Sequence, residues 1–369
     1  ILLVMGSGAS PVADSSIFVD YIFGALKNNG HDVHLFQFNK FLDQATPSQL
    51  KDPKGSLEEE IFNQYNHYGP FDYFLSFLSD QQVTPEIYKL IGKNTFTINW
   101  SCNMHQFDDL HKDIAPHVNL NTYIQLKHKA LYDSVGANSY WSPMAASPEA
   151  SLPTQVVKDI DLSFIGTAYG NRPHYIWRLI LAGFKPNVYG FGWGKKTFLQ
   201  NILRLHIAPI IYPFLEESIA INGFDRVLRE LYIQRIFNGG FSHGIPTDSE
   251  YLSLLSRSKI SLNFPENREN NNFSSPYVNF CCNLRDFEIP MANSMLFTQF
   301  NYELEHFYED GKEVVSFYND EDMIDKLQYY QKNPSIAEAI ANAGYKRAVL
   351  EHTWNNRLNQ LISYADSIS

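Results

Sequence analysis

The stretch from 283 to 288, Asn-Leu-Arg-Asp-Phe-Glu, combines residue types suited to a phosphate-bearing ligand. Arg285 comes just after Asn283 at the predicted start of a helix over 284–293. Its guanidinium and the free backbone N–H groups of the first turn could stabilise phosphate oxygens together. Glu288 follows one turn later on the same face, and a carboxylate accepts hydrogen bonds from hydroxyl groups. The alternative is a solvated ion pair between residues three apart, which binds nothing.

Two glycine-containing turns follow predicted strands in the same half of the chain. Gly166 ends a strand over 161–165, and Gly190 ends a strand over 187–190. Small residues at such points let a backbone approach a ligand closely. Arg172 follows Gly166 and could add a second positive group. A tight turn that binds nothing is the alternative for both glycines.

The N-terminal half offers its own loop residues. Gly6, Ser7 and Gly8 form a glycine-rich turn after the first predicted strand, and the missing third glycine argues against an NAD or FAD site. His105 and Asp108 follow a strand predicted over 96–100, at the carboxyl end where α/β sheets bind ligands. Either side chain could act as a base, and ordinary surface residues of a loop are the alternative.

Metal ligands are not apparent in the sequence. It contains no H-E-x-x-H element, Asp108-Asp109 lacks the intervening residue of a D-x-D element, and its three cysteines, Cys102, Cys281 and Cys282, lack metal-ligand spacing. We therefore expect no metal and no other cofactor. An odd number of cysteines, two of them adjacent, is typical of a reducing cytoplasm.

Apolar β-branched runs alternate with amphipathic helices along most of the chain, a pattern that predicts parallel α/β sheets. The elements expected in the first half are strands over 1–6, 31–38, 72–78, 96–100 and 138–143, with helices over 16–29, 56–67, 85–91 and 124–135. Those expected in the second half are strands over 161–165, 187–190, 259–264, 295–299 and 314–318, with helices over 172–182, 198–211, 224–236, 249–256, 284–293, 322–331, 336–351 and 354–365.

The order of these elements predicts two Rossmann-like domains, over 1–150 and 151–352, joined by a Pro- and Ser-containing linker over 145–157. A segment without obvious strands, about 194–246, is expected to be a helical insertion in the second domain. The final helix, within 353–369, is expected to pack back on the first domain. Asp320 is expected to cap one late helix, and Ser335 with Glu338 to form a capping box for the next.

Charge and composition exclude some classes of partner. The formal net charge of −11 over 369 residues opposes binding to nucleic acid, although a local basic site for one diphosphate remains compatible with it. We expect a cytoplasmic protein, since its apolar runs are too short to span a bilayer. The run 207–214 in the insertion could touch a membrane peripherally, but a buried helix pair or an oligomer contact suits its lack of a basic rim better.

Five sequence elements in one order resemble a known family. Residues 163–172 and 190–193 are similar to F-x-G-x-x-x-x-N-R and G-x-G-W elements, and 283–289, 306–313 and 352–357 are similar to N-x-R-x-F-E-x, L-F-x-x-G-K-E and H-T-x-x-x-R elements. These elements resemble the CgeB-like (spore maturation protein) branch of group 1 glycosyltransferases. The resemblance covers about 160–193 and 248–360, and the first half matches only in general rhythm.

The resemblance implies a GT-B fold, in which two Rossmann-like domains face each other across a cleft, and transfer of a sugar from a nucleotide-sugar donor to a glycan or other acceptor. It places the donor beside 283–288, with Glu288 on the ribose, and the turn at 6–8 on the acceptor side. Phe280 stands where the family's E-x7-E pattern has its first glutamate. A non-catalytic scaffold that binds nucleotide-sugars or glycans, or a nucleotide-sugar epimerase, therefore remains an alternative.

Overall fold

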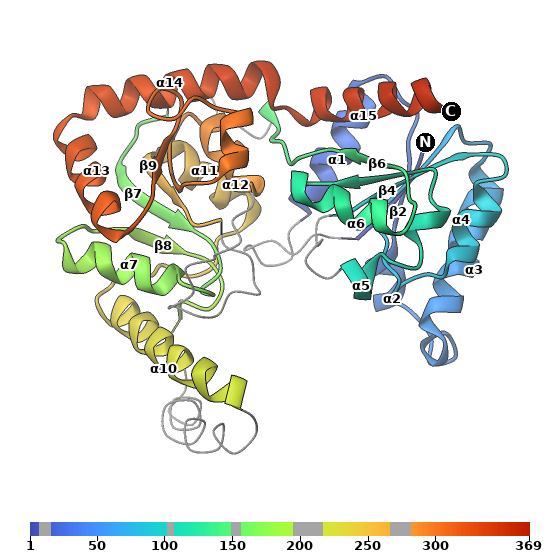
Figure 1. Ribbon diagram of the computed structural model, residues 1–369, viewed down its shortest axis with the longest axis horizontal. Helices are drawn as coiled ribbons and strands as arrows, with labels where there is room; N and C mark the ends of the chain where they lie inside the picture. The colour runs from blue at the N-terminus through green and yellow to red at the C-terminus, as the bar shows by residue number, and fades with distance from the viewer. Residues whose placement is uncertain (7–15, 102–106, 149–155, 195–216, 266–281) are drawn as a thin grey trace. The chain divides into compact units, whose positions relative to one another are not determined.

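The computed structural model describes residues 1–6, 16–101, 107–148, 156–194, 217–265 and 282–369. They divide into two compact units (Figure 1). Unit 1 contains the described residues of 1–147 together with 352–369, so both chain termini belong to it, and unit 2 contains those of 148–351. The boundaries between the two units therefore fall after residues 147 and 351, whereas the predicted domains end at residues 150 and 352.

Unit 1 is built on a six-stranded parallel sheet in the order β2-β1-β3-β4-β5-β6. Its first strand, the apolar run LLVM, is buried along its whole length, as expected for a strand covered on both faces. The strands are β1 (Leu2–Met5), β2 (His34–Gln37), β3 (Tyr73–Ser76), β4 (Phe96–Trp100), β5 (Leu120–Tyr123) and β6 (Ser139–Trp141). The helices are α1 (Ile17–Asn28), α2 (Phe38–Asp43), η1 (Gln49–Lys51), α3 (Pro53–Tyr68), α4 (Pro85–Ile91), α5 (Phe107–Leu110), η3 (Ala115–His117), η4 (Leu126–His128), α6 (Lys129–Ser134) and α15 (Trp354–Ile368).

The region between 115 and 135 corrects the sequence prediction. The expected helix over 124–135 is interrupted, because η4 and α6 form separately, and β5 precedes them without having been predicted. The strand was not predicted because its sequence, Leu-Asn-Thr-Tyr, is not a continuous apolar run. Asn121 is 1% exposed, and its Nδ2 donates to the carbonyl of Ala115 at 2.9 Å, so a hydrogen bond to the neighbouring loop replaces apolar packing.

The C-terminal helix α15 packs against α1 within unit 1. Trp354 meets Phe18 edge to face, with 5.6 Å between ring centroids, and Nδ2 of Asn29 donates to the carbonyl of Asn355 at 2.9 Å. Oγ1 of Thr353 accepts from the backbone N–H of Asn356 and so caps the helix. The last segment of the chain thereby completes the core of the unit that the first segment begins.

Unit 2 is built on a five-stranded parallel sheet in the order β11-β10-β9-β7-β8, and Ser242 adds a bridge to Val188 beyond β8. Its strands are β7 (Ile160–Ile165), β8 (Asn187–Tyr189), β9 (Ser258–Asn263), β10 (Met295–Gln299) and β11 (Val315–Phe317). Its helices are α7 (Arg172–Leu181), α10 (Glu217–Asn238), α11 (Asp248–Arg257), α12 (Leu284–Met291), η8 (Tyr302–His306), α13 (Asp320–Lys332) and α14 (Pro334–Glu351). The helix predicted over 198–211 lies outside the described residues.

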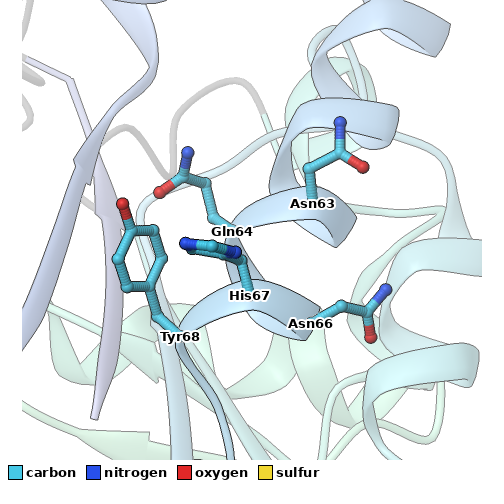
Figure 2. Close-up of a pocket in the computed structure, with 5 residues that line it drawn as sticks. All are labelled: Asn63, Gln64, Asn66, His67 and Tyr68. Atoms are coloured by element: carbon cyan, nitrogen blue, oxygen red, sulfur yellow. The ribbon is translucent and has the colours of Figure 1, made fainter.

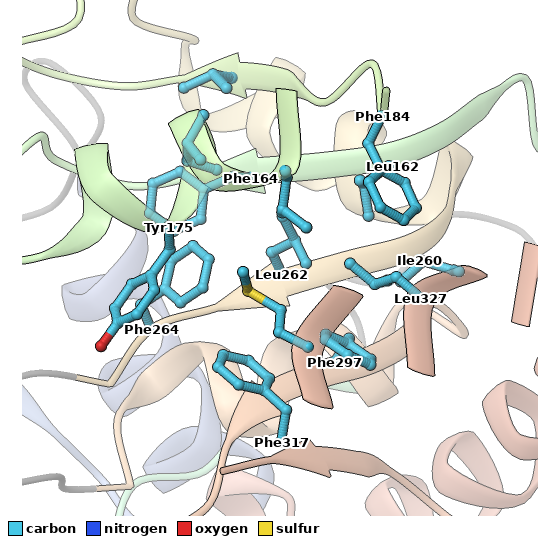
Figure 3. Close-up of a cluster of buried hydrophobic side chains, with 14 of the residues drawn as sticks. Leu162, Phe164, Tyr175, Phe184, Ile260, Leu262, Phe264, Phe297, Phe317 and Leu327 are labelled. Atoms are coloured by element: carbon cyan, nitrogen blue, oxygen red, sulfur yellow. The ribbon is translucent and has the colours of Figure 1, made fainter. Parts of the chain in front are cut away.

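Aromatic rings pack among aliphatic side chains in the core of unit 2 (Figure 3). Tyr175 stacks on Phe264 with 5.0 Å between centroids, and Phe297 stacks on Phe317 at 5.3 Å. Phe264 also meets Phe164 at 5.2 Å, so rings from β7, α7, the end of β9, β10 and β11 form one contiguous cluster. This cluster gives the loops above it a rigid base.

Two predicted helix caps in unit 2 are wrong. Asn319, not Asp320, caps α13, because Oδ1 of Asn319 accepts from the backbone N–H of Asp322 at 2.9 Å. The helix predicted from Ile336 begins at Pro334, so Ser335 lies inside it and cannot be its N-cap. Proline suits the first position of a helix, which needs no backbone donor.

Candidate functional site

The strand order of unit 2 locates its crevice. From β7 the chain crosses in one direction to β8, whereas β9, β10 and β11 extend the sheet in the other direction. Ligands of open α/β sheets bind where this order reverses, outside the carboxyl ends of the two central strands. Here those ends are Ile165, followed by Gly166, and Asn263, followed by Phe264.

Arg172 joins the two sides of this switch point. Its Nε and Nη2 donate to the carbonyl of Phe264 at 3.1 and 2.9 Å, and its Nη1 donates to the carbonyl of Thr167 at 3.2 Å. The side chain is 2% exposed and lies 3.9 Å from the centre of the Tyr169 ring. Arg172 is therefore a positioning residue of the crevice, and its predicted contact with a ligand stays a prediction.

Gly166 and Gly190 allow the ends of β7 and β8 to approach closely. Gly190 has a φ of +125°, and a Cβ there would lie 2.4 Å from the carbonyl oxygen of Gly166. The same carbonyl accepts from Nε1 of Trp193 at 2.6 Å. Backbone packing thus requires glycine at 190 without any ligand, and the predicted donor contacts of both glycines stay predictions.

The first turn of α12 stands beside the end of β9 and is fixed by a capping box. Oδ1 of Asn283 accepts from the N–H of Arg285 at 2.9 Å, and Oδ2 of Asp286 accepts from the N–H of Asn283 at 2.9 Å. Asp286 also takes hydrogen bonds from Asn263 at 2.7 Å and Thr298 at 3.3 Å. The start of the helix is therefore anchored to both β9 and β10.

Sequence reasoning missed Asp286, although its place three residues after an asparagine N-cap was a signal for it. The side chain is 1% exposed. Burial raises the pKa of its carboxyl to about 6, against the opposing effect of its hydrogen bonds and of the nearby Arg285 charge. A group with this role holds the site in place and does not contact solvent.

Arg285 is half-buried in the same turn. Its Nε is shielded from solvent and has no hydrogen-bond partner in the described part of the chain. Because a buried guanidinium N–H is costly without an acceptor, the side chain is poised to bind one. Among the described residues of this edge, Arg285 is the positively charged one with open hydrogen-bonding capacity.

Glu288 lies one turn further along α12 and is 3% exposed, so the alternative of a solvated ion pair with Arg285 is wrong. It accepts a hydrogen bond from the hydroxyl of Tyr251 on α11. Burial, followed by the Glu288 charge, raises the pKa of Tyr251 well above its ordinary value. The carboxylate does bind a hydroxyl, that of a tyrosine; its predicted contact with a ligand hydroxyl stays a prediction.

Unit 1 has its own switch point, between β1 and β3. Gly6 follows β1, and a Cβ there would lie 2.7 Å from the Phe38 ring. Ser7, Gly8 and His105 lie outside the described residues. Asp108 is on α5 with a side chain that is 79% exposed, 3.2 Å from Nζ of Lys112. The predicted roles of Gly6 on the acceptor side and of Asp108 as a base stay predictions.

Sequence reasoning also missed a buried polar pair beside β4. Oγ of Ser101 and Nε2 of His111 are 2.7 Å apart, and the two residues are 1% and 5% exposed. Burial lowers the pKa of His111 to about 4, so the ring is neutral at physiological pH. The pair fixes the point where the chain leaves the carboxyl end of β4.

An open cavity of about 470 Å³ lies on unit 1, lined by the last two turns of α3 (Figure 2). Tyr68 in its wall stacks on His34, the first residue of β2, with 3.9 Å between centroids. The cavity is therefore at the amino ends of the strands, opposite the edge where α/β sheets bind ligands. We do not assign it to the site.

No group of three or more His, Cys, Asp or Glu side chains suited to a metal ion occurs among the residues that the structure describes. In the same residues, every helix is too short or too polar to cross a bilayer.

The α12 site falls within a recognised family region. Residues 217–363 match the family model described as "Glycosyl transferase-like". This match runs from α10 into α15 and includes Arg285 and Glu288. The match is to this general family and does not confirm the CgeB-like branch that the sequence elements suggested. None of the curated proteins matches the chain.

Solved structures resemble the whole chain. Sucrose-phosphate synthase from Thermosynechococcus elongatus is 12% identical, with a TM-score of 0.62 over 100% of this chain and 99% of the synthase. HepE of Anabaena, in complex with UDP and glucose, is 9% identical, with a TM-score of 0.60 over 99% of each chain. A glycosyltransferase from Rickettsia africae is 12% identical, with a TM-score of 0.60 over 100% of this chain and 98% of that one. The chain has the GT-B fold, as predicted.

Proposed function

We propose that this chain is a glycosyltransferase that takes its sugar from a nucleotide-sugar donor bound at the carboxyl edge of the unit 2 sheet. The observation that carries the proposal is Arg285, half-buried in the first turn of α12 with an Nε that lacks an acceptor among the described side chains and backbone. A diphosphate would supply that acceptor. The family match over 217–363, and the UDP held by HepE of Anabaena, support the same reading.

The reaction needs stabilisation of a leaving group, because negative charge gathers on the diphosphate as the glycosidic bond breaks. The Arg285 guanidinium and the N–H groups at the start of α12 would provide it without a metal ion. The backbone at Gly166 and Gly190 would approach the donor, and Glu288 would accept from a ribose hydroxyl after exchanging its bond with Tyr251. Arg172 would act through the loops that it holds.

The reacting end of the acceptor is proposed to bind at the carboxyl edge of the unit 1 sheet. The turn at Gly6, Ser7 and Gly8 would contact it, and His105 or Asp108 would remove the proton of the attacking hydroxyl if the reaction needs a protein base. Neutral His111 would contribute by fixing the position of Ser101, which precedes His105 in the chain.

A thermal-stability screen tests the donor site. The folded protein is screened against UDP-, GDP-, dTDP- and ADP-sugars and the free nucleotides, because a ligand at one hundred times its Kd stabilises by about 2.7 kcal/mol. One nucleotide family should raise Tm, and Arg285→Ala should abolish that rise. Arg257→Ala is the matched control, since Arg257 precedes β9 at the opposite edge of the same sheet and pairs with Asp159 on the surface.

Three results would contradict the proposal. A folded wild type that responds to no nucleotide would favour a scaffold without turnover. A shift that survives Arg285→Ala unchanged would remove the α12 turn from the site. Conversion of donor into a stereoisomeric sugar nucleotide, in the absence of any acceptor, would indicate an epimerase.

A further inference from the structure

Three aromatic side chains meet at the carboxyl ends of β10 and β11 in unit 2. Phe300 follows β10, Tyr302 begins η8, and Tyr318 follows β11. Phe300 stacks on Tyr318 with 4.6 Å between centroids and 28° between planes, and meets Tyr302 edge to face at 5.0 Å and 79°. We call these three residues the aromatic corner, because the Tyr302 ring stands nearly perpendicular to the ring of Phe300, on which Tyr318 stacks.

The aromatic corner is open to solvent. Tyr302 is 80% exposed and Tyr318 is 60% exposed, whereas the rings directly below them, such as Phe317, are buried. Exposed aromatic surface that is gathered in one place marks a binding site more often than scattered single residues do. The corner is also held in place, since the N–H of Phe300 donates to the carbonyl of Phe317 at 2.8 Å.

The aromatic corner lies on the same edge of the sheet as the donor crevice. β9, which borders the switch point, pairs with β10, and β10 pairs with β11. Adjacent strands are about 4.8 Å apart, so the corner begins within roughly 5–10 Å of the end of β9. A ligand that reached both places would extend along the sheet edge by a few sugar units.

Charge around the aromatic corner disfavours an anionic ligand. The loops and helix starts that follow β10 and β11 carry five carboxylates, those of Glu303, Glu305, Asp320, Glu321 and Asp322. Two cations offset part of this charge: Arg178 pairs with Asp320 at 3.0 Å and with Glu321 at 3.6 Å. Lys326, whose Nζ lies 5.4 Å from the centre of the Tyr318 ring, pairs with Asp322 at 3.0 Å. The field at the corner is therefore negative, which disfavours phosphates, anionic lipids and acidic glycans.

We propose that the aromatic corner binds a sugar ring of an uncharged acceptor glycan, which makes the acceptor a neutral oligosaccharide or polysaccharide. This inference rests on the function proposed above. One face of a pyranose ring is apolar and packs on an aromatic face, while its hydroxyl groups donate to carboxylates and tyrosine oxygens. Tyr302 offers the exposed face, and Phe300 with Tyr318 forms the second wall.

The test uses the full chain and neutral oligosaccharides as probes. Saturation-transfer NMR and titration measure binding of glucose, mannose, galactose and N-acetylglucosamine, each as monosaccharide and hexasaccharide. We expect at least one hexasaccharide to bind and its monosaccharide to bind more weakly. Tyr302→Ala should weaken that binding about tenfold, and Tyr302→Phe, which keeps the ring, should stay within about twofold of the wild type.

Tyr329→Ala is the matched control, because Tyr329 is another exposed tyrosine of unit 2, on α13, outside the corner. It should leave glycan binding unchanged. Binding of UDP, GDP, dTDP or ADP should be the same in all variants, and a Tyr302→Ala variant that loses nucleotide instead of glycan would assign the corner to the nucleobase. Failure of the wild type to bind any neutral oligosaccharide, or equal binding by Tyr302→Ala, would overturn the inference.

The two proposals fail separately. Nucleotide binding that depends on Arg285 without any glycan binding would overturn only the aromatic corner as a glycan site. Glycan binding that depends on Tyr302, in a protein that binds no nucleotide, would overturn the transferase and leave a glycan-binding protein. Preference of the wild type for anionic vesicles over every oligosaccharide, lost in Tyr302→Ala, would contradict the charge argument and assign the corner to a lipid surface.

Discussion

The two units share one topology but differ in what their sheets bury. In unit 1 the buried polar side chains of the described residues belong to Ser, Thr, Asn, Gln and His residues such as Asn99 and His111, and none belongs to Asp, Glu, Lys or Arg. Unit 2 buries formal charges as well, on Arg172, Asp286 and Glu288 around its switch point and on Glu230 of α10. Burying a charge is costly unless it is hydrogen-bonded.

This difference teaches where a charged ligand is best accommodated. A unit that already pairs buried charges with backbone and side-chain partners has a rigid, polar edge that needs little reorganisation when a diphosphate arrives. A unit with neutral buried groups suits an uncharged substrate. The assignment of the donor to unit 2 and of the reacting end of the acceptor to unit 1 follows this division, and measurements of stability test it.

The largest effect is expected for Arg172→Met. The change leaves the carbonyls of Phe264 and Thr167 without their guanidinium donor, and each buried unsatisfied group costs about 1–3 kcal/mol. We expect unit 2 to lose about 3–4 kcal/mol of unfolding free energy, measured by hydrogen exchange of peptides from each unit. Arg257→Met, on the surface, should cost under about 1 kcal/mol, and equal losses for both variants would contradict the bridging role.

Opposite pH dependence of the two units is the next largest effect. The native pKa of Asp286 is raised to about 6 from 3.8, so unit 2 gains stability as pH falls from about 6 to 4. The native pKa of His111 is lowered to about 4 from 6.5, so unit 1 loses stability as pH falls over a similar window. At about 1.4 kcal/mol per pKa unit, each contribution is on the order of 3 kcal/mol.

Hydrogen exchange between pH 4 and 7 resolves these slopes by unit. Asp286→Asn should flatten the slope of unit 2, and His111→Gln should flatten that of unit 1, each without altering the other unit. Parallel slopes in the two units, unaffected by both variants, would show that these buried groups do not control the stability of the units.

A smaller effect is expected for Asn99→Ala in unit 1. Nδ2 of Asn99 donates to the carbonyl of Leu78, and Oδ1 accepts from the N–H of Leu78, each at 3.0 Å. This amide therefore joins β4 to the segment that follows β3, in the same way that Arg172 joins the ends of β7 and β9. Oδ1 also accepts from the hydroxyl of Ser76 at 2.9 Å, and removing the neutral amide from these neutral partners should cost about 2 kcal/mol. Urea unfolding of the variant checks this value, and a loss as large as that of Arg172→Met would remove the distinction between the units.

Sequence reasoning succeeded where burial alone decides the structure. The predicted strands over 96–100 and 295–299 and the helix over 85–91 have the observed bounds, because an apolar run or a proline start defines each of them. It missed the network at the switch point, since the partners lie far apart in the chain. Arg172 and Phe264 are 92 residues apart, and no local sequence pattern indicates that a guanidinium donates to so distant a carbonyl.

The smallest effect on stability is expected at Asp108, and this makes its variant informative about chemistry. Its ion pair with Lys112 joins side chains that are 79% and 54% exposed, and such pairs contribute under about 0.5 kcal/mol. Asp108→Asn should therefore leave Tm unchanged to within about 1 °C. Turnover is then measured as release of nucleotide. The donor is the nucleotide-sugar that raises Tm in the screen, and the acceptor is the oligosaccharide that binds best. Because stability is unchanged, a loss of turnover reports a role in proton transfer. If turnover falls at least about a hundredfold while Tm and donor affinity hold, Asp108 acts as the base, whereas unchanged turnover removes it from the site and leaves His105 as the candidate.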